Sequence, residues 1–162
     1  MRAPLVVFAV GNPSRGDDAI GPALCRHLDE RLQARGLADQ VELIEDFQLN
    51  IEHVLDLCER RLALFVDAGE QTPAPYQFAR AVPSTVIGHS THALPPENVL
   101  GVYRQTEGDE PPPAFVLGVR GECFELGEGL SQEAQANLGA ACALLEALLD
   151  DLSPEAWAAR CA

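Results

Sequence analysis

Residues 5–36 read LVVFAVGNPSRGDDAIGPALCRHLDERLQARG, and they indicate the fold class most clearly. Residues 5–10 are a continuous apolar run ended by Gly-Asn-Pro, which is typical of a strand buried on both faces and stopped by a turn. From Asp18 onward, apolar residues recur every three or four positions as far as Gly36, which predicts an amphipathic helix with a glycine C-cap. The stretch is therefore a strand, a loop and a helix, the repeating unit of α/β proteins.

The rest of the chain continues this alternation of strands and helices. Apolar or alternating runs predict strands at 41–44, 62–66, 76–82 and 114–119, with 123–126 extending the sheet. Helical spacing predicts helices over 51–62, from 95 and after a Ser131 cap. We expect a three-layer α/β sandwich, with a mostly parallel twisted sheet of about five strands and helices on both faces. A single domain over 1–152 and a C-terminal tail over 153–162 complete the prediction.

The charge balance disfavours several classes of partner. The 162 residues carry 25 acidic and 11 basic side chains, a formal net charge of -14, and none of the basic residues is a lysine. This charge repels phosphate backbones and anionic lipid, so we expect neither nucleic acid nor a membrane as partner. Without lysine, the chain has neither a Schiff-base nucleophile nor the lysine of a Walker phosphate loop.

The cysteines and the N-terminus indicate a cytoplasmic protein. Five cysteines are far apart, odd in number and without a C-x-x-C pair, which fits reduced thiols better than a disulfide framework or a zinc ribbon. The first apolar run is too short to span a bilayer and is followed by no cleavage site. We expect a cytoplasmic monomer without an anchor.

Carboxylates follow two of the predicted strands. Asp17 and Asp18 lie between the first strand and its helix, and Asp67 ends the third strand. In a structural reading, Asp17 caps the helix and Asp18 favours its dipole, while Asp67 forms a turn. In a functional reading, these acids meet at the carboxyl edge of the sheet, where α/β proteins bind their ligands.

Two histidines, His89 and His92, lie in a polar loop after the fourth strand. Two carboxylates and His92 would form an open site for zinc, nickel, manganese or iron, able to polarise a carbonyl or activate water. Without a metal, the paired acids could share general acid and base catalysis. The residues alone leave both possibilities open.

Several motifs, taken in order, resemble a known family. They are the G-N-x-x-x-x-D-D loop at 11–18, the strand-ending acid in Phe-Val-Asp-Ala at 65–68, Ser-Thr-His-Ala-Leu at 90–94, and Leu-Gly-Val at 117–119. This order is similar to that of the hydrogenase maturation peptidases, which trim the C-terminal extension from the large subunit of nickel-iron hydrogenases. The resemblance covers nearly the whole chain.

The resemblance implies a site and a partner. It implies an aspartic-type endopeptidase with no serine or cysteine nucleophile, acting on a hydrogenase large-subunit precursor after nickel insertion. Asp18, Asp67 and His92 are the implied metal ligands, and Asp18, Asp67 and the supporting acid Asp17 are the implied catalytic residues. The implied metal is nickel, supplied by the precursor, with other divalent metals as substitutes in vitro.

The family also has an acid near the end of the second strand, and Glu45 and Asp46 both qualify here. Two alternative functions stay open. One is a maturation chaperone that binds the same precursor without cleaving it. The other is a receiver-like phosphoacceptor domain, which shares the acidic pair and the strand-ending aspartate but requires a lysine that this chain lacks.

Overall fold

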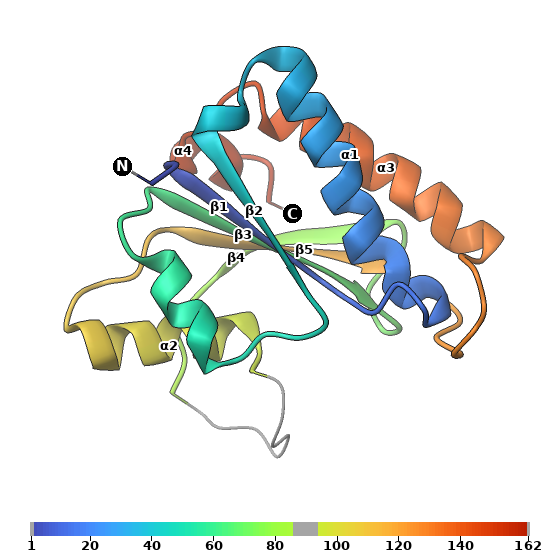
Figure 1. The fold of residues 1–162 in the computed structure, drawn as a ribbon, viewed down its shortest axis with the longest axis horizontal. Coiled ribbons are helices and arrows are strands. Elements are labelled where there is room, and N and C mark those ends of the chain that lie inside the picture. The colour runs from blue at the N-terminus through green and yellow to red at the C-terminus, as the bar shows by residue number, and fades with distance from the viewer. Residues whose placement is uncertain (1, 86–93, 162) are drawn as a thin grey trace.

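A computed structural model describes residues 2–85 and 94–161. Its sheet has five strands in the order β2-β1-β3-β5-β4 (Figure 1). The strands are β1 (Leu5–Val10), β2 (Val41–Asp46), β3 (Leu62–Gly69), β4 (Tyr76–Ala81) and β5 (Ala114–Arg120). The first four strands of this order are parallel, and β4 runs antiparallel to β5 at one edge.

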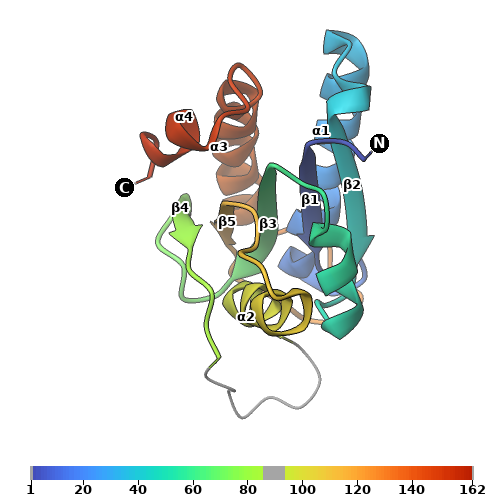
Figure 2. The same cartoon turned by 90° about the vertical axis from the view of Figure 1, so that its left-hand side faces the viewer.

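Helices cover both faces of the sheet (Figure 2). On one face lie α1 (Ile20–Arg35), α3 (Gln132–Leu148) and α4 (Pro154–Ala158). On the other face lie α2 (Pro96–Glu107) and the 3-10 helix η3 (Ile51–Leu57). The chain also forms the short 3-10 helices η1 (Gly16–Ala19) and η2 (Ala38–Gln40). The predicted three-layer sandwich is confirmed. No helix in the described part of the chain is long and apolar enough to cross a membrane.

Strand alternation divides the core into two layers. In β3, Leu62, Leu64 and Val66 pack with α1 and α3, whereas Ala63 and Phe65 pack with α2 and η3. Phe8 of β1 stacks on Phe65 with ring centroids 4.9 Å apart. Because successive strand residues face opposite sides, the next residue in the Ala63 and Phe65 series is Asp67, on the face of α2 and η3.

The structure differs from the sequence prediction in two elements near the site. Residues 123–126 are not a strand. The backbone N–H groups of Glu122 and Cys123 instead donate to the buried carboxylate of Asp17, so a side chain satisfies them in place of a neighbouring strand. The predicted helix over 51–62 is the shorter η3, and it is followed by an extended turn into β3.

The segment that we predict as a C-terminal tail contains α4 and contributes to the core. Trp157 is 1% exposed and lies edge-on to Phe78 and Phe115. Its indole N–H donates to the carbonyl oxygens of Leu148 and Asp151, at 3.1 and 2.9 Å. The buried indole therefore has its polar atom satisfied, and the segment packs against the end of the sheet.

Candidate active site

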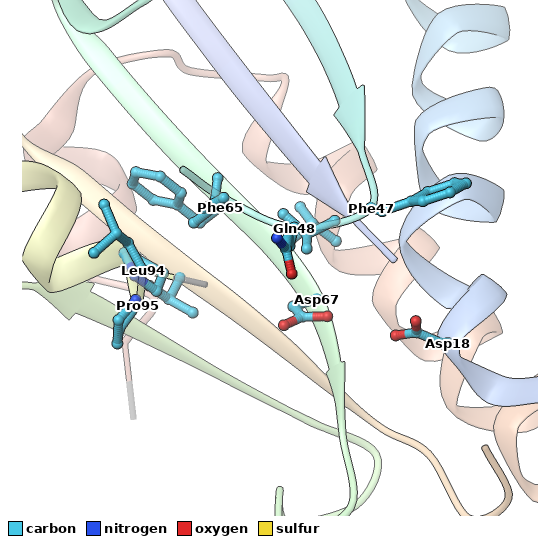
Figure 3. Close-up of a pocket in the computed structure, with 12 residues that line it drawn as sticks. Asp18, Phe47, Gln48, Phe65, Asp67, Leu94 and Pro95 are labelled. Carbon is cyan, nitrogen blue, oxygen red and sulfur yellow. The ribbon is translucent and has the colours of Figure 1, made fainter. Parts of the chain in front are cut away.

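A cavity of about 470 Å³ lies at the carboxyl ends of β1 and β3, beside the N-terminus of α2. Figure 3 shows this pocket. Its lining residues are Val10, Asp18, Phe47, Gln48, Leu49, Phe65, Val66, Asp67, Leu94, Pro95, Pro96 and Val116. All of these side chains are apolar except those of Asp18, Gln48 and Asp67, so the pocket places three polar groups in an apolar surround.

Asp67 projects into the pocket from the end of β3. The residue is exposed overall, and its side chain lines the pocket. Burial is the main cause that raises the pKa of Asp67 to about 7, and the negative charge of Asp18 adds to it. The N–H of Ala68 donates to Oδ1 at 2.7 Å, and this hydrogen bond acts in the opposite direction. Near neutral pH the carboxyl group can therefore both accept and donate a proton.

Asp18 lies in η1, and its carboxylate points toward the end of β3 (Figure 3). The backbone N–H of Asn12 donates to its Oδ2 at 2.8 Å, which fixes the side chain over the loop that leaves β1. A Cβ at Gly11 would lie 2.1 Å from the carbonyl oxygen of Asp18, and Gly11 has a φ of 151°. Only glycine allows this loop to approach η1 closely enough to position Asp18 at the pocket.

Asp17 points away from the pocket and is fully buried. Its carboxylate accepts hydrogen bonds from the backbone N–H groups of Glu122, Cys123 and Ser131 and from the Ser131 hydroxyl, at 2.7 to 3.0 Å. Burial acts to raise its pKa, but these hydrogen bonds together outweigh burial and lower it. Asp17 is an ionised anchor for the loop before α3, so the geometry does not favour the catalytic role that we predict for it.

The predicted ligand His92 and its neighbour His89 lie outside the described residues. Within 2–85 and 94–161, no group of three or more histidine, cysteine, aspartate or glutamate side chains could hold a metal ion. The described part of the site therefore supplies two carboxylate donors, Asp18 and Asp67. Carboxylates suit divalent cations, and two of them alone leave most coordination positions of a metal ion open.

Neither Glu45 nor Asp46, the two candidates at the end of the second strand, lines the pocket. Both line a neighbouring cavity of about 390 Å³, and Phe47 lies between the two cavities. Asp46 accepts the backbone N–H of Phe47 at 2.7 Å, and its Oδ2 lies 3.4 Å from Nε2 of His53. Asp46 therefore shapes the segment that walls the pocket.

Gln48 is a pocket residue to which the sequence analysis assigns no role in the site. It lies two residues beyond the end of β2, and Figure 3 shows the oxygen of its side-chain amide facing Asp67. The signal available in the sequence is its place just after a strand end, the same signal that identifies Asp67. A glutamine there has no distinctive pattern, so only the folded structure places it at the site.

The sequence matches no family model and no curated protein. Solved structures do match. The chain is similar to the hydrogenase maturating endopeptidase HybD of Escherichia coli, with 25% identity, a TM-score of 0.69 and 93% of each chain covered. It is similar to another Escherichia coli endopeptidase with 28% identity, a TM-score of 0.66 and 92% of each chain covered. The nickel-iron hydrogenase maturation protease HycI of Thermococcus kodakarensis shares the fold. It is 24% identical to this chain, with a TM-score of 0.67, and the match covers 93% of this chain and 94% of HycI.

The fold and the pocket define an α/β protein with two carboxylates at the carboxyl edge of a mostly parallel sheet. The solved structures confirm the predicted resemblance to the hydrogenase maturation peptidases. The chain is similar, over more than nine tenths of its length, to solved hydrogenase maturation peptidases.

Proposed function

We propose that this chain is an endopeptidase that removes the C-terminal extension of a nickel-iron hydrogenase large-subunit precursor. The observation that carries the proposal is the convergence of Asp18 and Asp67 on one pocket at the carboxyl edge of the sheet. The likeness to a solved hydrogenase maturating endopeptidase over 93% of both chains supports the same substrate class.

The proposed reaction is direct hydrolysis of a peptide bond. Asp67, as carboxylate, accepts a proton from a water molecule while the water oxygen attacks the scissile carbonyl carbon. The protonated Asp67 then donates that proton to the leaving nitrogen, the C–N bond breaks, and the products are a carboxylic acid and an amine. Without a metal ion beside it, Asp67 has a pKa of about 7, which suits both halves of this cycle near neutral pH. No nucleophilic side chain is required.

Nickel enters this proposal as part of the substrate. Asp18 and Asp67, with His92 as the predicted third ligand, would contact a nickel ion that the precursor already holds. The nickel supplies a Lewis acid and a means of recognition when bound. Three ligands from this chain would bind the ion weakly alone and more tightly when precursor thiolates complete its coordination. Processing would then follow nickel insertion.

The test is the intact mass of the precursor after incubation with this chain. Nickel-loaded and nickel-free precursors are run in parallel. Loss of a C-terminal peptide from the nickel-loaded sample alone supports both the endopeptidase and the nickel requirement. Equal loss from both samples supports the endopeptidase and contradicts the nickel requirement. An unchanged mass despite measured binding contradicts cleavage and favours the maturation chaperone.

A further inference from the structure

Exposed apolar side chains gather on one segment of the described chain. Phe47, Ile51 and Leu55 are 65%, 63% and 61% exposed, and all three lie between β2 and the end of η3. The other large apolar residues that are exposed in the described part, Val82 and Leu126, lie in separate loops. Single exposed apolar residues are ordinary on a protein surface, whereas a group of them marks an interaction surface.

The helix η3 has a buried face and an outer face. Its buried residues are His53, Val54 and Leu57, and the last two belong to the core layer shared with α2. Figure 2 shows η3 beside α2, on the β2 side of the fold. A solvent-facing helix surface is ordinarily polar throughout. The outer face of η3 instead combines apolar and acidic residues, namely Ile51, Glu52, Leu55 and Asp56.

The acids of this outer face are available to a partner. Neither the Glu52 nor the Asp56 side chain has a hydrogen bond or an ion pair with another residue that the structure describes. The basic side chains that touch the segment have other contacts. Arg2 donates to backbone carbonyl oxygens in η3 and in the turn after it, and Arg60 pairs with Glu42. Apolar side chains with unpaired acids between them fit a partner segment that presents apolar side chains among arginine or lysine residues.

The outer face begins beside the proposed active site. Phe47, Gln48 and Leu49 line the pocket, and we call these three residues the pocket wall. The carbonyl oxygen of Leu49 accepts the N–H of Leu94 at 3.1 Å, which fixes the wall to the approach to α2. Asn50 follows the wall and caps η3. A partner on the outer face of η3 is therefore anchored next to the pocket that holds the two carboxylates.

A second copy of this chain is disfavoured as the occupant. In a symmetric dimer the same surface meets itself, so the acids of one η3 would approach the acids of the other. The net charge of -14 adds to the repulsion between copies. The same acids repel anionic lipid. A partner with both apolar and basic side chains is therefore favoured over a second copy and over a membrane.

We propose that the outer face of η3 docks a surface segment of the hydrogenase large-subunit precursor in which apolar side chains lie among arginine or lysine residues. The proposal rests on the proposed peptidase function for its partner. Ile51 and Leu55 bury apolar surface against the precursor, and Glu52 and Asp56 pair with its basic side chains. These contacts lie outside the pocket and are equally strong before and during the reaction, so they contribute to affinity and not to kcat.

The test measures kcat and KM for precursor cleavage by the double variant Ile51→Gln/Leu55→Gln. We expect KM to rise at least about tenfold, while kcat stays within about twofold of the wild-type value. Val82→Gln is the control, because Val82 is 67% exposed and follows β4, at the opposite edge of the sheet from β2. It should leave both constants unchanged. Circular dichroism and thermal unfolding show whether each variant keeps the wild-type fold.

The double variant Glu52→Gln/Asp56→Asn separates charge from apolar contact. We expect it to raise KM at least about threefold at low ionic strength, and the difference from the wild-type chain to shrink in about 0.5 M NaCl, because salt screens the ion pairs of the wild-type chain. Asp39→Asn, at an exposed acid in η2, is the control and should have the wild-type KM. A KM for Glu52→Gln/Asp56→Asn equal to that of this control would contradict pairing with basic side chains.

A binding measurement keeps the two proposals distinguishable. The Kd for nickel-loaded precursor is measured in the Asp67→Asn chain, with and without Ile51→Gln/Leu55→Gln. If KM and Kd of the folded double variant stay within about twofold of the Val82→Gln control, the docking face is overturned and the peptidase function holds. If the wild-type chain binds without cleaving, the peptidase function is overturned, and a weaker Kd for the double variant still supports the docking face. A dimer that Ile51→Gln/Leu55→Gln dissociates in analytical ultracentrifugation would assign the face to a second copy and overturn the proposal.

Discussion

At the scale of single residues, three aspartates in similar sequence positions have different environments. Asp17 is fully buried among four hydrogen-bond donors and has a lowered pKa. Asp67 has one backbone donor, an apolar surround and a pKa raised to about 7. Asp18 lines the same pocket, and its negative charge contributes to the raised pKa of Asp67. Hydrogen-bond donors and burial therefore separate an anchoring acid from an acid suited to proton transfer.

The raised pKa of Asp67 predicts a pH-dependent cost in stability. Between its usual pKa of 3.8 and about 7, the unfolded chain has lost this proton while the folded chain retains it. The free energy of unfolding therefore falls as pH rises through that window, and the full cost is present above it. We expect Asp67→Asn to gain stability over the wild-type chain from pH 4 to pH 8, measured by urea denaturation at both values.

The control for that experiment is Asp39→Asn, the same change at an exposed position in η2. Its difference from the wild-type chain should vary less between the two pH values. An Asp67→Asn stability difference that stays constant, or that shrinks toward pH 8, would contradict the raised pKa. The expected result also means that the wild-type chain retains a destabilising group at its site, as a functional acid often requires.

Asp17 and Asp18 should differ sharply when replaced. Asp17→Ala leaves the part-buried N–H groups of residues 122, 123 and 131 without their acceptor, so we expect it to lower the free energy of unfolding by roughly 2–4 kcal/mol. Asp18→Asn retains an oxygen for the Asn12 N–H and should cost less than about 1 kcal/mol. Urea denaturation of both variants gives these values. Equal losses of stability would show that Asp17 is not the anchor.

At the scale of elements, the segment between β2 and η3 links local structure to the site. Asn50 begins η3 and forms a capping box with His53, since its Oδ1 accepts the N–H of Glu52 while His53 accepts the N–H of Asn50. The same histidine lies edge-on to Phe8 in the core, with ring centroids 5.7 Å apart. The start of η3 therefore sets the position of the pocket wall at residues 47–49.

His53→Ala tests this link. The variant removes the acceptor for Asn50 and the contact with Asp46, so the wall can shift relative to Asp67. Because small displacements of a binding group are costly in catalysis, we expect kcat/KM for precursor cleavage to fall at least about tenfold. His53→Asn can supply an oxygen to the Asn50 N–H and should recover part of this loss. Activity of folded His53→Ala equal to that of the wild-type chain would show that the contacts of His53 with Asp46 and Asn50 have no role in the site.

At the scale of the whole molecule, the sequence predicts the features that depend on local patterns. Buried strands appear as apolar runs such as residues 5–10, the helix after Asp18 ends at Gly36 with a φ of 69°, and Ser131 caps α3 as expected. Because parallel strands end at one edge, the sequence also predicts that Asp18 and Asp67 approach one another, and both line the same pocket.

The remaining features depend on contacts between segments far apart in the chain. Asp17 is an anchor because residues 122–131 fold over it, more than a hundred positions away. Trp157 belongs to the core because α4 packs across the sheet. The wall around Gln48 depends on His53 and on the hydrogen bond to Leu94. No local pattern shows these pairings, so only the folded chain identifies them.

We propose that Asp18 and Asp67 act together in cleaving a hydrogenase large-subunit precursor. The most direct test is the intact mass of nickel-loaded precursor after incubation with the wild-type chain, Asp18→Asn, Asp67→Asn and the control Asp39→Asn. We predict that the wild-type chain and the control release a C-terminal peptide, and that the two pocket variants release it at least about 100-fold more slowly. Wild-type rates for folded Asp18→Asn and Asp67→Asn would contradict a catalytic role for these two aspartates.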